Sequence, residues 1–275
     1  MQPSIFWFRL KSSFSFYFKS KSKYRIHSPF TFHLIKNCFD NDVFDDVNVL
    51  AKTLNVREFL KTDTTTFTYN DLGAAGSSHQ KVLKVSDVYR KSVSSHNKSL
   101  LLYRIARYLK PDTIIECGTS LGVNAGYLSS AAKNKYIGIE GDEFLALKTK
   151  SILKLFGNNH EVVNGEIEEE LRSILNRSSG DNLLIYLDGN HTYEALKSNV
   201  NLIIDQINNR KTYVIVDDIR WSKQMYEAWT ELKQSSNVGL SLDFFQFGLI
   251  TLNMKVRKQS IKIYNQNMLS MLLMG

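Results

Sequence analysis

The stretch from Asp112 to Asp142 constrains the fold of this chain more than any other part of the sequence. It opens on a short β-branched apolar run that stops at Glu116, and glycine and small polar residues follow at once, which is typical of a buried strand ending in a turn. Apolar residues then recur at helical spacing after Gly122. A second short strand ends on Glu140, 24 residues after Glu116. This order predicts a strand, a glycine turn, a helix and a second strand of one parallel sheet.

The turn reads E-C-G-T-S-L-G, and its two glycines let the backbone approach a ligand at the start of the following helix. Phosphate-binding turns read G-x-G-x-x-G or G-x-x-x-x-G-K-[ST], and this turn has neither the middle glycine nor the lysine. A diphosphate is therefore not the expected ligand. The position of Glu140 is close to the spacing of roughly 20 residues at which an acid on the second strand binds the ribose of a nucleoside-type cofactor.

These residues resemble the class I S-adenosylmethionine-dependent methyltransferases, particularly the O-methyltransferase-like branch, whose turn often reads E-x-G-[ST]-x-x-G. Ser120 departs from the E/D-x-G-x-G-x-G form of the wider superfamily. The resemblance covers roughly residues 100–255 and implies S-adenosylmethionine as cofactor. It implies contacts to the methionine half from Glu116, Gly118, Thr119 and Asn124, to the ribose from Glu140, to the adenine from Gly165, Glu166 and Ile167, and further cofactor contacts from Ser120, Gly122 and Asp188.

Strands and helices alternate after Glu140, which predicts a parallel sheet with crossover helices. The last two expected strands, 238–242 and 245–253, are nearly adjacent and must pair antiparallel, because a parallel pair needs a long crossover. The predicted fold class is α/β: a Rossmann-like class I methyltransferase fold with a mostly parallel seven-stranded sheet, a terminal antiparallel hairpin and a largely helical N-terminal extension. The seven strands are expected at 113–116, 136–140, 161–165, 183–188, 212–217, 238–242 and 245–253.

Acids also end the fourth and fifth expected strands, where ligands of open α/β sheets bind. The fourth strand ends in Asp188-Gly189-Asn190-His191, and the fifth in Asp217-Asp218. Metal-dependent catechol-type O-methyltransferases carry D-x-x-K-x-x-Y and D-N at these places, so here histidine replaces lysine and aspartate replaces asparagine. The D-G-x-H-x-Y ending is also similar to that of some sugar and natural-product O-methyltransferases. The resemblance implies that Asp188, Asp217 and Asp218 hold a divalent metal such as Mg²⁺, and that His191 and Asp188 are catalytic.

Two chemistries fit these side chains. His191 could remove the proton of an acceptor hydroxyl near neutral pH, or a divalent ion on hard carboxylate oxygens could lower the pKa of that hydroxyl. Each residue also has a non-catalytic alternative. His191 could cap a helix or make a surface contact, and Asp217-Asp218 could cap the next helix. Trp221, Tyr226 and Trp229 lie at helical spacing and are expected to pack rather than to form a substrate box.

Residues 1–39 carry seven Lys or Arg and no acid, whereas the rest of the chain has 28 bases against 27 acids. The net charge of +8 thus belongs to this arm, not to a nucleic-acid-binding body. Large aromatic residues interleave with the cations, so the arm is expected either to cap the domain or to lie on an anionic membrane surface. The large aromatic residues that interleave with the cations are Phe6, Trp7, Phe8, Phe14, Phe16, Tyr17, Phe18, Phe30 and Phe32.

The predicted organisation is an N-terminal extension and cap over 1–99, a cofactor-binding domain over 100–255 and a tail over 256–275. Val43, Val47, Leu50, Leu54 and Leu60 are expected as the buried stripe of a helix over 40–60. A second glycine turn, Asp71 to Gly76, lacks an acid-ended strand downstream and is expected to be a decoy or a mobile loop over the ligand.

Two cysteines, Cys38 and Cys117, give no disulfide framework, and no apolar run approaches the roughly 18 residues of a membrane span. We therefore expect a cytoplasmic protein, membrane-peripheral if the arm binds lipid. The expected activity is O-methylation of a small-molecule or sugar hydroxyl. The alternative is a non-catalytic, membrane-associated binding protein that retains the fold, and an NAD-dependent oxidoreductase is disfavoured by the turn and the terminal hairpin.

Overall fold

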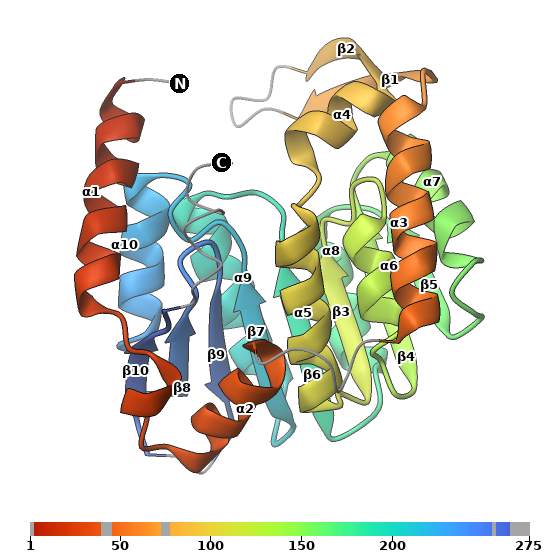
Figure 1. The fold of residues 1–275 in the computed structure, drawn as a ribbon. Coiled ribbons are helices and arrows are strands. Elements are labelled where there is room, and N and C mark those ends of the chain that lie inside the picture. Colours follow the sequence, from red (N-terminus) through yellow and green to blue (C-terminus); the bar gives the residue numbers. More distant parts are fainter. Residues whose placement is uncertain (1–2, 40–45, 73–77, 255–256, 265–275) are drawn as a thin grey trace. The chain divides into compact units, whose positions relative to one another are not determined.

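The computed structural model describes residues 3–39, 46–72, 78–254 and 257–264. The chain forms two compact units (Figure 1). Residues 42–171 form one, which we call the central unit, and residues 1–41 with 172–275 form the other, the terminal unit. Each unit is built around its own set of strands.

The central unit contains three parallel strands in the order β3-β4-β5. Their interior is apolar, and Ile114, Ile115, Ile137 and Ile139 are at most 1% exposed, as expected of strands covered on both faces. The register sets Cys117 opposite Ile139, so β3 and β4 end at the same edge. The elements are α5 (His96–Leu109), β3 (Thr113–Cys117), α6 (Val123–Ser129), β4 (Lys135–Glu140), α7 (Glu143–Leu153), β5 (His160–Asn164) and α8 (Ile167–Arg177), which crosses the unit boundary.

A helix and a hairpin precede these strands: α3 (Val47–Thr62), β1 (Thr66–Leu72), β2 (Ser78–Lys84) and α4 (Val85–Ser92). The predicted stripe of α3 is wrong at Val47 and Leu54, which are 76% and 46% exposed, and right at Leu60, which is fully buried, while Val43 lies outside the described residues. The buried residues of α3 are Val49, Thr53, Val56, Arg57 and Leu60. Strand β1 includes Asp71 and Leu72 of the second glycine turn, whereas the rest of that turn, residues 73–76, lies outside the described residues.

The terminal unit contains five strands in the order β10-β8-β9-β7-β6. β6 and β7 are parallel, while β9 is antiparallel to both β7 and β8, which confirms the predicted terminal hairpin. The two units thus hold eight such strands instead of the expected seven. The extra strand, β10, pairs parallel with β8 inside the expected C-terminal tail. The elements are β6 (Asn182–Leu187), α9 (Tyr193–Gln206), β7 (Lys211–Val216), α10 (Lys223–Leu232), β8 (Val238–Asp243), β9 (Gly248–Leu252) and β10 (Gln259–Lys262).

The N-terminal segment of the terminal unit is helical, as predicted, with α1 (Pro3–Lys19), the short 3₁₀ helix η1 (Lys23–Arg25) and α2 (Pro29–Phe39). Helix α1 lies beside α10 (Figure 1), where the Phe8 ring packs on Tyr226 at 6.1 Å. Lys21 exchanges backbone hydrogen bonds with Lys262 and Tyr264 at the β10 edge. None of the described helices is both long and apolar enough to cross a membrane.

Helix α1 packs on a buried ion pair of the terminal unit, between Arg220 and Asp243. The Arg220 guanidinium donates to both carboxylate oxygens of Asp243, at 2.8 and 2.7 Å, and both residues are at most 5% exposed. Arg220 also donates to Ser12 Oγ at 2.9 Å, and its guanidinium lies 5.1 Å from the centre of the Phe16 ring. These contacts support the view of α1 as a cap.

Candidate active site

The glycine turn lies in the central unit, between β3 and α6. Gly118 and Gly122 have φ of 92° and 74°, a region that residues with side chains rarely adopt. Three amides of the turn donate within the protein, from Gly118 to Ile139 O at 2.9 Å, from Ser120 to Glu140 Oε2 at 2.6 Å and from Gly122 to Thr119 O at 2.9 Å. An anion-binding turn directs its amides at the ligand. The geometry therefore agrees with the motif in disfavouring a diphosphate.

Glu140 ends β4, and its carboxylate holds the turn closed. Oε2 accepts from the Ser120 amide and Oε1 from the Asp142 amide at 3.1 Å, while the residue is 9% exposed. Burial raises the pKa of Glu140, and the backbone hydrogen bonds offset part of that rise. A carboxylate offers about four acceptor positions, so each oxygen can still accept one more donor. Two vicinal hydroxyls, such as those of a ribose, match that remaining capacity.

A close contact between β4 and the turn explains why a glycine stands at position 138. A Cβ on Gly138 would lie 2.6 Å from Thr119 Cγ2 and 3.0 Å from the Tyr136 hydroxyl oxygen. Thr119 is 3% exposed, and its hydroxyl is 3.3 Å from that of Thr149 on α7. Thr149 also donates to Ser120 O at 3.0 Å. Gly138 and Thr149 therefore position the turn, although sequence reasoning singled out neither of them.

Glu116 is fully buried and accepts a hydrogen bond from the Tyr136 hydroxyl. Burial, together with the charge of Glu116, raises the pKa of Tyr136 well above its ordinary value, so the phenol stays a neutral donor. Burial and the same carboxylate also raise the pKa of the Cys117 thiol. Cys117 is 1% exposed and serves in packing, because a protonated thiol is a weak nucleophile.

Asn124, on α6, belongs to a buried polar network with α3 and α5. Its Oδ1 accepts from Ser99 Oγ at 2.7 Å, and its Nδ2 is 3.4 Å from Ser94 Oγ. Arg57 donates to the same two serines, to Ser99 Oγ at 2.8 Å and to Ser94 O at 2.9 Å. Arg57 is 6% exposed, and nothing in the α3 sequence marks it as a core residue. The network fixes the orientation of the Asn124 amide.

The three expected adenine contacts follow β5. The Gly165 amide donates to Glu140 O at 3.1 Å, so this segment starts beside the end of β4. The Asn164 side chain donates to the same carbonyl at 2.8 Å and ties the two strand ends together. Glu166 is exposed and Ile167 half-exposed. The structure thus brings Gly165 next to Glu140, as a shared cofactor site requires.

In the terminal unit, two strand-end aspartates meet at one tyrosine. The Tyr186 hydroxyl oxygen lies 2.6 Å from Asp217 Oδ2 and 3.0 Å from Asp188 Oδ2. Asp217 is 1% exposed, and its Oδ1 accepts from the Asp218 amide at 2.8 Å. The Tyr186 hydroxyl has one proton, so the carboxylates of Asp188 and Asp217 share a single donor. Tyr186 is another residue that the sequence motif did not reveal.

His191 lies beside this pair. Its Nε2 is 3.8 Å from Asp188 Oδ1 and 3.9 Å from Asp218 Oδ2, and the side chain is 24% exposed. The capping alternatives are wrong: Thr192 caps α9 by accepting from the Ala195 amide, and Ser222 caps α10. His191 is thus a partly accessible imidazole between two carboxylates.

The predicted metal ligands do not assemble into a metal site. Within residues 3–39, 46–72, 78–254 and 257–264, no group of three or more His, Cys, Asp or Glu is placed so that it could hold a metal ion. Asp217, the most buried of the three predicted ligands, uses both of its oxygens in hydrogen bonds to Tyr186 and to the Asp218 amide. Among the described residues, Asp188, Asp217 and Asp218 therefore do not form the expected three-carboxylate site.

Trp221 differs from the packing role expected of it. Trp229 is fully buried, as predicted, but Trp221 is 51% exposed, and its ring centre lies 6.2 Å from that of His191. Arg9 of α1 covers the Trp221 ring at 4.8 Å and donates to Trp221 O at 3.1 Å. The N-terminal extension therefore reaches the side chains around His191.

A family model described as a methyltransferase domain matches residues 115–219. The matched segment begins in β3 and ends just after β7, so it includes both the glycine turn and the aspartates around His191. No curated protein matches the chain. This segment of the chain is therefore similar to methyltransferase domains.

Solved structures show the fold of that domain. The SAH-bound methyltransferase PaMTH1 of Podospora anserina is 15% identical, with a TM-score of 0.54 over 84% of this chain and 97% of its own. An O-methyltransferase of Bacillus cereus in complex with SAH is 13% identical, with a TM-score of 0.52 over 80% and 95%. The O-methyltransferase TomG of Streptomyces achromogenes, in complex with SAM, is 15% identical, with a TM-score of 0.50 over 76% and 91%. The fold is that of the class I methyltransferases.

Proposed function

We propose that this protein transfers the methyl group of S-adenosylmethionine to a hydroxyl oxygen of a small molecule or sugar. The carrying observation is the glycine turn closed by Glu140, inside the segment that matches a methyltransferase domain. Three of its amides, those of Gly118, Ser120 and Gly122, donate within the protein, which disfavours a diphosphate cofactor, whereas Glu140 retains acceptor capacity for ribose hydroxyls. Two of the solved structures with this fold contain SAH and one contains SAM, which supports the same cofactor here.

We assign cofactor binding to residues of the central unit. In the central unit, Glu140 binds the ribose, and the segment from Gly165 to Ile167 binds the adenine. Glu116 and the turn bind the methionine half, with Glu116 oriented by Tyr136. When bound, S-adenosylmethionine supplies an electrophilic methyl group on a sulfonium.

In the terminal unit, His191 acts as the base. His191 would accept the proton of the acceptor hydroxyl when the acceptor oxygen takes the methyl group that S-adenosylmethionine supplies. The imidazolium that forms lies between Asp188 and Asp218, at 3.8 and 3.9 Å, and their charges stabilise it. The Tyr186 hydroxyl lies 3.0 Å from Asp188 Oδ2 and helps to position that carboxylate. Positioning of the acceptor provides much of the remaining acceleration.

Turnover and cofactor binding respond differently if His191 acts on the acceptor. We expect His191→Ala to lower SAH production from S-adenosylmethionine by roughly a hundredfold or more, with little change in calorimetric cofactor affinity. The assay uses a panel of phenols and monosaccharides as acceptors. His33→Ala, an exposed histidine of α2, is the matched control and should retain full turnover.

Two results would replace this mechanism. If EDTA abolishes turnover, Mg²⁺ restores it and His191→Ala stays active, a divalent ion and not His191 activates the acceptor hydroxyl. Tight cofactor binding without turnover on any acceptor would favour the non-catalytic alternative.

A further inference from the structure

Helix α1 uses one of its faces to pack on the terminal unit. Phe16 is 3% exposed, and its ring lies 5.3 Å from Phe245. One and two turns earlier, Ser12 accepts from Arg220 and Arg9 donates to Trp221 O. These residues, four or three apart along the helix, define its inner face. The aromatic residues of the arm were expected to act either as a cap or as a membrane contact, and the inner face performs the first role.

The opposite face of α1 exposes large apolar side chains to solvent. Its apolar residues, spaced by three and four, form one continuous row, which we call the exposed stripe. The exposed stripe consists of Trp7 (65% exposed), Leu10 (38%), Phe14 (60%), Tyr17 (51%) and Phe18 (80%). Contiguous exposed apolar rows of this kind are rare on soluble proteins and mark interaction surfaces.

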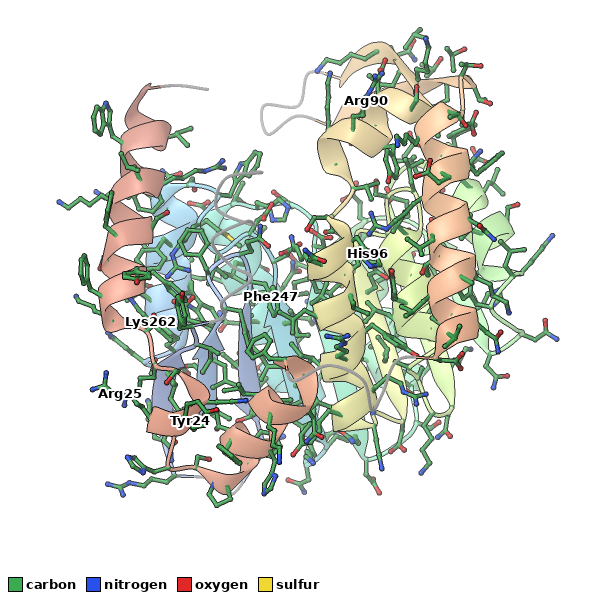
Figure 2. The ribbon with its side chains drawn as sticks, viewed as in Figure 1. Tyr24, Arg25, Arg90, His96, Phe247 and Lys262 are labelled. Atoms are coloured by element: carbon green, nitrogen blue, oxygen red, sulfur yellow. The ribbon has the colours of Figure 1, made fainter. Side chains whose placement is uncertain are left out.

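Cations surround the exposed stripe. Lys11 and Lys19 are exposed on the same helix, and Lys21 and Arg25 are exposed just after it. None of these four forms an ion pair with an acid among the described residues, and no acid occurs before Asp40. Tyr24, next to Arg25, is 82% exposed and adds a further aromatic ring (Figure 2). The surface is therefore apolar and uniformly positive.

We propose that the exposed stripe docks this protein on an anionic lipid bilayer, with α1 lying in the plane of the headgroups. An anionic bilayer binds both the exposed stripe and the cations around it. The rings enter the boundary between headgroups and acyl chains, and each nearby Lys or Arg strengthens binding roughly fivefold. A phosphate groove of a nucleic acid would use the cations but not the outward row of rings. The proposal is independent of the proposed function, because it rests on α1 and η1 alone.

Vesicle co-sedimentation of the full chain tests the proposal. We expect binding to phosphatidylcholine vesicles that contain phosphatidylserine, weaker binding at high salt, and little binding to phosphatidylcholine alone. Phe14→Ser with Phe18→Ser should lower the vesicle partition by roughly tenfold or more, since each loses the burial of a large ring. Lys11→Glu with Lys19→Glu should reduce binding to the anionic vesicles to a similar or greater extent.

The matched control removes exposed leucines elsewhere. Leu147→Ser with Leu155→Ser, residues 56% and 53% exposed in the central unit, should leave vesicle binding unchanged. Absence of binding to anionic vesicles overturns the proposal, as does binding that the stripe variants leave intact. It is also overturned if the stripe variants instead lower the melting temperature, or dissociate a dimer in sedimentation velocity, since either result means that protein covers the exposed stripe.

Discussion

Replacement of Gly138 by alanine tests the contact that positions the glycine turn. The new Cβ would lie 2.6 Å from Thr119 Cγ2 and 3.0 Å from the Tyr136 hydroxyl oxygen, whereas carbon atoms prefer about 3.5–4.0 Å. Gly138 is central in β4 and pairs with β3 and β5 on its two sides, so its backbone has little freedom to move away. The turn must therefore shift by about 1 Å at Thr119.

Overpacking of this kind costs roughly 1–3 kcal/mol, so we expect the free energy of unfolding to fall by about 2 kcal/mol in urea titrations. Cofactor affinity should fall by about tenfold or more, because Thr119 belongs to the binding turn. Gly141→Ala is the matched control: its Cβ meets nothing within 4 Å, and its stability should change by no more than about 0.5 kcal/mol.

Removing the opposing methyl group should rescue the variant. Thr119→Ser keeps the hydroxyl that faces Thr149 but deletes Cγ2, so the double variant should recover roughly 1 kcal/mol or more relative to the sum of the single changes. The reasoning is refuted if Gly138→Ala costs no more than Gly141→Ala, or if Thr119→Ser gives no recovery.

Three further predictions concern charged groups. Burial alone would raise the pKa of Asp63, but hydrogen bonds from Lys148 and a threonine lower it from 3.8 to about 2. This pair stabilises the fold by at most about 2 kcal/mol, and the contribution is present above pH ~4 and lost as the pH falls towards 2. In urea titrations, Asp63→Asn should therefore lower the free energy of unfolding by about that amount at pH 7 and by little at pH ~2. Arg220→Met should lower the free energy of unfolding by about 3–5 kcal/mol in the same assay, because it leaves the Asp243 carboxylate buried and unpaired. The double variant Arg220→Met with Asp243→Leu should recover much of that loss, and equal stability of the single and double variants would contradict the reasoning. Arg57→Met should lower both the free energy of unfolding and the calorimetric affinity for the cofactor, because Asn124 loses the network that orients its amide. If stability falls and affinity does not, the network contributes to folding and not to cofactor binding.

The sequence was most informative where burial on both faces of the sheet leaves a simple pattern. The runs around Ile114 and Ile137 are continuously apolar and end in acids, and the structure places β3 and β4 there within a residue of the prediction. The antiparallel hairpin followed from loop length alone. The sequence did not predict strand β10, because its four residues are at most half-buried and show no apolar run.

The missed parts of the site depend on contacts between residues distant in sequence. Arg57 is buried because Ser94 and Ser99 receive its hydrogen bonds, and a polar residue in a helix gives no hint of such partners. Trp221 remains exposed because Arg9 and His191, rather than a core, surround its ring. Gly138 reads as an ordinary strand glycine, although a glycine inside a strand often marks a close approach of another segment. That signal was present and could have been used.

Calorimetric titration of one sample with S-adenosylmethionine, SAH and NAD tests the central claim most directly. We expect the first two to bind and NAD not to bind, because three amides of the turn donate within the protein while Glu140 keeps acceptor positions for a ribose. Glu140→Ala, confirmed as folded by circular dichroism, should weaken S-adenosylmethionine binding by roughly tenfold or more, and Glu143→Ala, an exposed acid in the next helix, should not. Binding of NAD, failure of both sulfur ligands to bind, or unchanged affinity in folded Glu140→Ala would contradict the cofactor assignment.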